Sequence, residues 1–168
     1  MAMFHNTIRI EPMAEEHIPA FRECLDAVAQ ERRYLALTSA PAPESVREFI
    51  RSAIARGVPQ FVALDGQSVV GWCDVFPNEK EGFTHTGRLG MGVLREYRGQ
   101  GIGRQLAMKA IERSKEIGLE RIELDVYASN KPAIALYESL GFALEGVKKK
   151  GRKVDGLYDD VIQMALLV

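Results

Sequence analysis

The residues with the clearest chemical meaning form a glycine-rich turn at 98–104, which reads RGQGIGR. Its alternating glycines are Gly99, Gly101 and Gly103. Glycine lets the backbone bend tightly and leaves its N–H groups unshielded. A helical pattern follows over residues 105–117, and N–H groups at a helix N-terminus lack intrahelical partners. Arg98 and Arg104 add positive charge on either side, so the turn predicts a site for phosphate or pyrophosphate.

The spacing of this turn separates it from two common nucleotide-binding loops. The P-loop pattern GxxxxGK[ST] is absent from the chain. The dinucleotide pattern GxGxxG fails because Arg104 stands where its third glycine is required. The remaining pattern, Arg98-x-x-Gly101-x-Gly103, fits another kind of pyrophosphate loop, and it also fits an ordinary glycine turn that opens a helix.

A second pattern follows at residues 130–142, which read NKPAIALYESLGF. Asn130 is followed seven residues later by Tyr137, and then by Gly141 and Phe142. The two patterns together resemble the hallmarks of the GNAT superfamily of N-acyltransferases, whose second motif is N-x-x-A-x-x-x-Y-x-x-x-G-F. Both occur here in the family's order, and the resemblance covers roughly residues 89–142.

The resemblance implies acetyl-CoA as co-substrate. Its pyrophosphate would lie on the turn, and its pantetheine arm would pair with the preceding strand as a short peptide strand does. A backbone N–H near Val93 would polarise the thioester carbonyl. The implied cofactor-binding residues are Met91, Val93, Arg98, Gly99, Gly101, Ile102, Gly103, Arg104, Asn130 and Tyr137. Gly90 and Gly92 suit a gap in a strand or close packing against a bulky neighbour, and Asn130 can also cap a helix.

The resemblance also implies that Tyr137 is the general acid, which donates a proton to the departing CoA thiolate. A phenol with a pKa of about 10 can protonate a thiolate within hydrogen-bond reach. The alternative is that Tyr137 is an aromatic core residue on an amphipathic helix.

The group that takes the proton from the acceptor amine stays open. An amine with a pKa of about 10 is mostly protonated at neutral pH and must lose a proton before it attacks. The candidates are His85, Asp125, Glu123, Asp159 and Asp160. His85 has a suitable intrinsic pKa, although a lone histidine is more often a surface or capping residue. Related enzymes often use a carboxylate on one of these strands, and Arg88 is not one.

The elements that position these motifs follow from the spacing of apolar residues. Strands are predicted at 7–11, 61–64, 69–76, 85–93 and 121–127, with two more within 144–167. Helices are predicted within 13–30, 46–54, 102–117 and 132–141. The fold class is α/β, a mixed, mostly antiparallel sheet of about six to seven strands flanked by about four helices, as in the GNAT fold. A splayed strand pair is expected around residues 89–93 and 121–127.

Composition limits the class of protein. The chain has 168 residues, of which 46% are hydrophobic and 27% are charged, and its net charge is −1. The length predicts one domain over residues 1–168, which the resemblance implies is an N-acetyltransferase domain, and the net charge argues against nucleic-acid and membrane partners. Cys24 and Cys73 fit no metal or redox spacing, which predicts reduced thiols, no metal site and a cytoplasmic protein.

We therefore expect an enzyme that moves the acetyl group of acetyl-CoA to a primary amine of a small molecule. The attack would be direct, in a ternary complex. The acceptor site would lie near residues 31–38 and 148–158, and a homodimer is plausible. Two alternatives are acetylation of a protein N-terminus or lysine and a non-catalytic acyl-CoA sensor.

Overall fold

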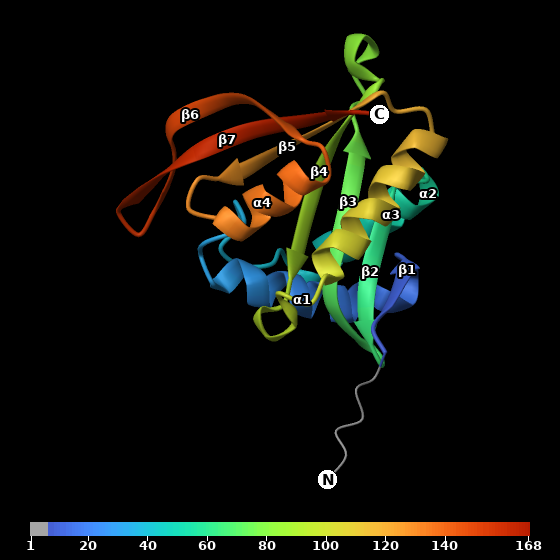
Figure 1. The fold of residues 1–168 in the computed structure, drawn as a ribbon. Coiled ribbons are helices and arrows are strands. Elements are labelled where there is room, and N and C mark those ends of the chain that lie inside the picture. Colours follow the sequence, from blue (N-terminus) through green and yellow to red (C-terminus); the bar gives the residue numbers. More distant parts are fainter. Residues whose placement is uncertain (1–6) are drawn as a thin grey trace.

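The computed structural model describes residues 7–168, which form one seven-stranded sheet flanked by four α-helices (Figure 1). The strands are β1 (Arg9–Pro12), β2 (Gln60–Asp65), β3 (Ser68–Pro77), β4 (Thr86–Val93), β5 (Arg121–Tyr127), β6 (Ala143–Val154) and β7 (Leu157–Leu167). The helices are α1 (Ile18–Gln30), α2 (Pro43–Ala55), α3 (Ile102–Glu116) and α4 (Lys131–Ser139), with short 3-10 helices η1 (Glu15–His17), η2 (Glu81–Phe83) and η3 (Arg95–Tyr97).

The strand order is β1-β2-β3-β4-β5-β7-β6, and every neighbouring pair is antiparallel except β4 and β5. The chain passes from β4 to the parallel β5 through α3, as such a crossover requires. The predicted mixed, mostly antiparallel sheet with about four helices is thus confirmed.

The helices cover both faces of the sheet (Figure 1). The face under α3 and α4 includes Leu89, Ile122 and Leu124 in one buried cluster with residues of both helices. The opposite face packs Val62 and Trp72 against α1 and α2 in a second cluster. These faces are named below the α3/α4 face and the α1/α2 face. Because side chains alternate along a strand, neighbouring residues of each strand serve different faces.

The predicted splay between β4 and β5 is present. The two strands pair only where Thr86, Gly87 and Arg88 lie beside residues 121–123. Residues 89–93 still pair with β3, but they have no pairing with β5. The central sheet therefore opens a gap after Arg88, and a ligand can reach the edge of β4 there.

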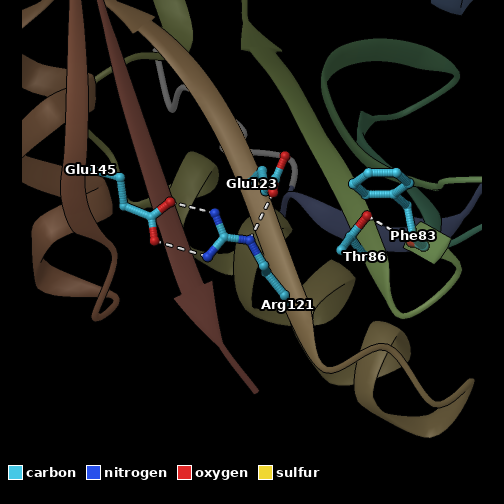
Figure 2. Close-up of polar contacts among 5 residues, drawn as sticks. All are labelled: Phe83, Thr86, Arg121, Glu123 and Glu145. Carbon is cyan, nitrogen blue, oxygen red and sulfur yellow. Dashed lines mark hydrogen bonds and ion pairs between the residues drawn. The ribbon is translucent and has the colours of Figure 1, made fainter.

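Polar contacts hold the closed end of this gap (Figure 2). Arg121, the first residue of β5, donates from Nε to Glu123 at 2.7 Å and forms a two-bond ion pair with Glu145 of β6. Beside it, the Thr86 hydroxyl donates to the carbonyl of Phe83 at 2.8 Å. The Arg121 contacts tie β5 to β6, and the Thr86 bond ties β4 to η2, at the end where β4 and β5 still pair.

No helix within residues 7–168 is both long and apolar enough to cross a membrane. Cys24 and Cys73 are free and buried, as expected of reduced thiols in a core. Burial raises the pKa of Cys24 to about 12 and raises that of Cys73 well above its usual value.

Candidate active site

The predicted phosphate turn connects η3 to α3 and has the backbone of an anion cradle. Gly99 and Gly101 adopt left-handed conformations, with φ of +73° and +79°. A Cβ at either position would meet nothing within 4 Å, so backbone conformation, and not crowding, accounts for glycine here. Gly101 is the N-cap of α3.

The N–H groups of this cradle are free to bind a ligand. Among the residues described, no backbone carbonyl accepts from the N–H groups of residues 99–104, and the first such bond along α3 runs from Gln105 to Gly101. Successive free N–H groups in a turn that leads into a helix form a concave anion site. This observation fits the pyrophosphate of a CoA thioester.

A cavity of about 330 Å³ joins this cradle to the gap in the sheet. Every residue predicted to bind the cofactor lines it, namely Met91, Val93, Arg98, Gly99, Gly101, Ile102, Gly103, Arg104, Asn130 and Tyr137. The cavity wall thus comes from β4, the turn, α3 and α4. The structure brings the two sequence motifs together around one space.

The glycines of β4 serve packing as well as access. A Cβ on Gly92 would lie 2.3 to 2.9 Å from the Trp72 ring, so close packing explains this glycine. Gly92 also lines the cavity. A Cβ on Gly90 would lie 3.2 Å from the Oδ1 atom of Asp74. The sequence left two explanations for the glycines of this strand, a gap for a ligand and close packing against a bulky neighbour. Both are true of Gly92.

Asn130 and Arg104 both fasten α4. The Asn130 side chain accepts from the backbone N–H of Ala133 at 3.3 Å, so the expected helix cap is confirmed. Arg104 donates to the Ser139 hydroxyl at 2.9 Å. Both residues line the cavity, and their remaining donors are available to a ligand there.

Arg98 lines the cavity, and its side chain also has protein partners. Its guanidinium donates to both carboxylate oxygens of Glu31, at 3.0 and 2.5 Å, and from Nε to the carbonyl of Val93 at 2.8 Å. It also lies over the Tyr34 ring, 4.6 Å from its centre. Its charge is therefore balanced by Glu31, at the edge of the cavity.

The segment between α1 and α2, residues 31–42, is fastened on its other side by the β6–β7 hairpin. Arg32 forms a two-bond ion pair with Asp155 at 2.9 and 2.8 Å. Arg152 donates to the carbonyls of Arg32 and Leu35, and it lies 4.4 Å from the ring centre of Tyr127, the last residue of β5. Arg98 binds the start of this segment at the end of β4, and Arg152 binds it at the end of β5. We call these contacts of Arg98, Arg32 and Arg152 the clasp.

Comparisons with known proteins agree with this geometry. Residues 16–142 match the acetyltransferase (GNAT) family. The chain belongs to the GNAT family. It is 30% identical over 138 residues to the L-amino acid N-acetyltransferase AaaT of Escherichia coli. This match covers 82% of this chain and 85% of AaaT. It is 34% identical over 123 residues to an N-alpha-acetyltransferase of Saccharolobus solfataricus, which covers 67% and 69% of the two chains.

Solved GNAT structures share the fold over nearly the whole chain. A GNAT acetyltransferase of Streptococcus pneumoniae superposes with a TM-score of 0.90 at 22% identity, over 96% of this chain and all of that one. The yncA protein of Salmonella typhimurium, solved with acetyl-CoA, has a TM-score of 0.90 at 19% identity, over 96% and 94%. The resemblance found in the sequence is confirmed, and the protein is an acyl-CoA-dependent N-acetyltransferase.

Within this GNAT site, Tyr137 reaches the cavity from the α3/α4 face. It is 6% exposed, and its ring packs against Phe142 at a centre distance of 5.7 Å. Burial, with a smaller contribution from Cys73, raises the pKa of its phenol well above the usual value. The side chain lines the cavity, and its hydroxyl makes no hydrogen bond to another described residue.

The predicted bases lie elsewhere. His85 precedes β4 at its far end, and it does not line the cavity. It is six residues from Met91, or about 20 Å along a strand, which argues against contact with the reacting amine. Asp125 pairs with Arg88 at 2.5 Å, and Glu123 is bonded to Arg121. The structure therefore separates His85 from the site and gives both β5 carboxylates a cationic partner.

The two carboxylates near the C-terminus also have partners. Asp159 accepts from the hydroxyl and backbone N–H of Ser129, and Asp160 pairs with Lys149 at 2.9 Å. The ion pair and a bond from the Lys150 N–H lower the pKa of Asp160. A lowered pKa makes a carboxylate a weaker base near neutral pH.

The sequence analysis missed one carboxylate, Asp74 of β3. It is half-buried on the α1/α2 face, directly opposite Gly90. Burial raises its pKa to about 7, although a hydrogen bond from the Gly90 N–H offsets part of this rise. The sequence held one signal for it, an acidic residue within the apolar strand GWCDVF, but not its position beside the gap.

Proposed function

We propose that this protein transfers the acetyl group of acetyl-CoA to a primary amine of a small molecule, by direct attack in a ternary complex. The observation that carries this proposal is the clasp. Arg98 and Arg152 fasten the α1–α2 segment at the ends of β4 and β5. The segment would therefore cross the opening of the gap through which the acceptor enters. Such an opening favours a small acceptor over an extended peptide.

The donor half of the reaction rests on the cradle and the gap. The free N–H groups of residues 99–104 would bind the pyrophosphate, while the edge of β4 would pair with the pantetheine amides. Backbone groups at Met91 and Val93 are the proposed partners of this arm. A backbone N–H near Val93 would donate to the thioester oxygen as negative charge develops there during attack.

The departing sulfur would meet Tyr137. Its raised pKa keeps the phenol protonated at neutral pH, so it can donate a hydrogen bond and then a proton to the thiolate. A covalent acetyl-enzyme is disfavoured because the two thiols among the described residues, Cys24 and Cys73, are buried and have raised pKa values. A protonated thiol is a poor nucleophile.

The named activities of the relatives span both acceptor classes. AaaT is an L-amino acid N-acetyltransferase, whereas other relatives, such as those of Saccharolobus solfataricus and Schizosaccharomyces pombe, are N-alpha-acetyltransferases. The longer match to AaaT, over 82% of this chain, and the clasp both support a small acceptor. A free amino acid is the first candidate to test.

The test is a panel of amino acids, polyamines, aminoglycosides and short peptides with free N-termini, each incubated with acetyl-CoA while thiol release is measured. We expect turnover of at least one small amine with a kcat/KM at least tenfold above that of any peptide. Turnover of peptides alone would overturn the small-molecule acceptor. Tight acetyl-CoA binding without turnover of any amine would point to a sensor.

We propose further that residues 1–168 act as one N-acetyltransferase domain. The cytoplasmic location and the homodimer remain predictions of the sequence. Analytical ultracentrifugation of the purified protein tests the homodimer directly.

A further inference from the structure

Asp74 lies on the α1/α2 face between two aromatic residues of its own strand. Trp72 packs edge-on against Phe21 of α1 at a centre distance of 5.6 Å. Phe76 stacks on Phe49 of α2 at 5.0 Å. Because side chains two residues apart on a strand share a face, Asp74 points to the same side as these two rings. Its carboxylate therefore lies beneath the layer formed by α1 and α2.

Asp74 has side chains beside it in three directions and a glycine in the fourth. Trp72 and Phe76 flank it along β3, and Gln60 lies opposite it on β2 and is 5% exposed. Gly90 lies opposite it on β4 and has no side chain. The carboxylate lies over Gly90, since a Cβ there would be 3.2 Å from its Oδ1 atom, and β4 separates from β5 after Arg88.

Asp74 does not itself line the cavity, but it lies next to two residues that do. Gly90 is followed by Met91 and Gly92, which line the cavity. Asp74 is diagonal to Gly92 across the two strands, a separation of about 7–8 Å between Cα atoms. Tyr137 reaches the same cavity from α4 on the opposite face. The gap thus has a carboxylate on the acceptor side and a phenol on the other.

We propose that Asp74 binds the ammonium group of the acceptor and takes its proton, so that this carboxylate is the catalytic base. This proposal rests on the amine acetylation proposed above. The two carboxylates that β5 presents on this face, Asp125 and Glu123, already have arginine partners. Among the described residues, Asp74 has no lysine, arginine or histidine partner, so its charge is available to a ligand cation.

The chemistry balances with one proton on each side of the gap. Asp74 takes one proton from the R–NH3+ group and later releases it to solvent. The freed lone pair attacks the thioester carbonyl carbon, forms the C–N bond and gives a tetrahedral intermediate. The C–S bond then breaks, and the sulfur leaves with a proton from Tyr137. A second N–H proton returns to the phenolate, so the products are the amide, CoA thiol and one released proton.

The charged and titratable groups around Asp74 determine the pH at which it is ionised. On β4, Arg88 shares its face but pairs with Asp125 of β5, while β2 contributes the neutral Gln60. The buried residues of α1 and α2 on this face include one titratable group, the thiol of Cys24, which stays protonated near neutral pH. Cys73 of the same strand faces α3 and stays protonated as well. With a pKa of about 7, Asp74 is partly ionised at physiological pH and can exchange a proton with an acceptor there.

The test compares Asp74→Asn with the wild type on an amine that the wild type acetylates, as a pH profile of kcat/KM from pH 5 to 10. We expect the wild-type profile to rise through an acidic limb near pH 7. The variant should lose at least 100-fold at pH 7. Its remaining activity should rise about tenfold per pH unit, because only amine that has already lost its proton can react. The Kd for acetyl-CoA should be unchanged.

Glu48→Gln is the matched control, since it removes one negative charge from an exposed position on α2. It should keep the wild-type profile. An Asp74→Asn profile that keeps the acidic limb would overturn the proposal, as would an equal loss of rate at every pH, which indicates a structural role. An Asp125→Asn variant that alone loses the limb would also overturn it.

A second measurement reads the titration of Asp74 in the wild-type protein and uses the variant only to assign the signal. Carbon-13 NMR of the aspartate carboxyl groups in the wild type should show a signal that titrates near pH 7, is absent in Asp74→Asn and shifts to lower pKa when the amine binds. An Asp74 signal that titrates near pH 4 would contradict the proposal. Absence of turnover by the wild type on every amine would instead contradict the proposed function. Normal turnover by both proteins would contradict the role of Asp74 alone.

Discussion

Arg98 and Glu31 join two parts of the site that lie far apart in the sequence. The two hydrogen bonds between them, at 3.0 and 2.5 Å, connect the phosphate turn to the first residue after α1. Both side chains are largely shielded, with 30% and 23% exposure. Since the turn would hold the donor and the α1–α2 segment borders the acceptor opening, this pair couples the two halves of the site.

Glu31→Gln should therefore affect both stability and acceptor binding. The substitution leaves a partly buried guanidinium with a neutral partner, which costs about 1–3 kcal/mol of unfolding free energy. The loosened clasp should raise the KM for the acceptor several-fold and change the KM for acetyl-CoA less. Urea unfolding and steady-state kinetics measure these effects.

The matched control for this prediction is Glu44→Gln. Glu44 pairs with Arg47 at 2.7 Å, but both side chains are about half exposed or more. An exposed pair contributes about 0–1 kcal/mol, so this variant should be close to the wild type. Equal losses of stability in both variants would show that the Arg98–Glu31 pair has no special role.

Tyr137→Phe should lower kcat at least tenfold and leave the fold and the Kd for acetyl-CoA unchanged. The hydroxyl has no protein partner among the described residues, so its removal leaves no buried polar group unpaired. The ring keeps its packing against Phe142. Pre-steady-state thiol release gives kcat, and isothermal titration gives the Kd. An unchanged kcat would exclude the acid role.

The fold and the donor side were predictable from the sequence because their signals are local. The left-handed turn conformations of Gly99 and Gly101, the free N–H groups and the cap by Asn130 all follow from short motifs. The parallel crossover also follows from local order, since a strand, a turn, a helix and a strand occur in succession. The expected splay between β4 and β5 needed the family resemblance in addition.

The acceptor side was less predictable because its contacts join distant residues. Arg32 and Asp155 are 123 positions apart, and the Arg98–Glu31 pair spans 67. Which residue lies opposite Gly90 depends on the register between β3 and β4, which the sequence does not state. For the same reason His85, a candidate base by residue type, precedes β4 at the end away from the cavity.

Gly101→Ala should weaken acetyl-CoA binding more than it weakens the fold. An alanine at φ of +79° costs about 1–2 kcal/mol, and relief of this strain would rearrange the N–H groups of the cradle. The matched control is Gly118→Ala at the other end of α3, where φ is +88° and a Cβ also has open space. Both variants should lose similar stability in urea.

Only the Gly101 variant should bind acetyl-CoA at least tenfold more weakly by isothermal titration. Wild-type Kd values in both variants would mean that the turn does not hold the pyrophosphate. Equal weakening in both would mean that overall destabilisation of α3 is the cause.

Asp74→Asn should stabilise the protein at high pH, although it lowers activity at neutral pH. The folded pKa of Asp74 is about 7, above the value of about 3.9 in an unfolded chain. Between these values the folded state binds more protons than the unfolded state, so stability from this group falls as pH rises from about 4 to 7. Above pH 7 the wild type carries the full cost of a half-buried carboxylate, and the neutral amide does not.

The difference in unfolding free energy between Asp74→Asn and the wild type should therefore grow with pH. We expect it to be near zero at pH 4.5 and to reach about 1–3 kcal/mol in favour of the variant at pH 8, which allows for partial solvation of the carboxylate. Urea unfolding at the two pH values measures it, with Glu48→Gln as the exposed reference. A variant that is less stable than the wild type at pH 8 would show that the ionised carboxylate is stabilised by the fold, contrary to its raised pKa.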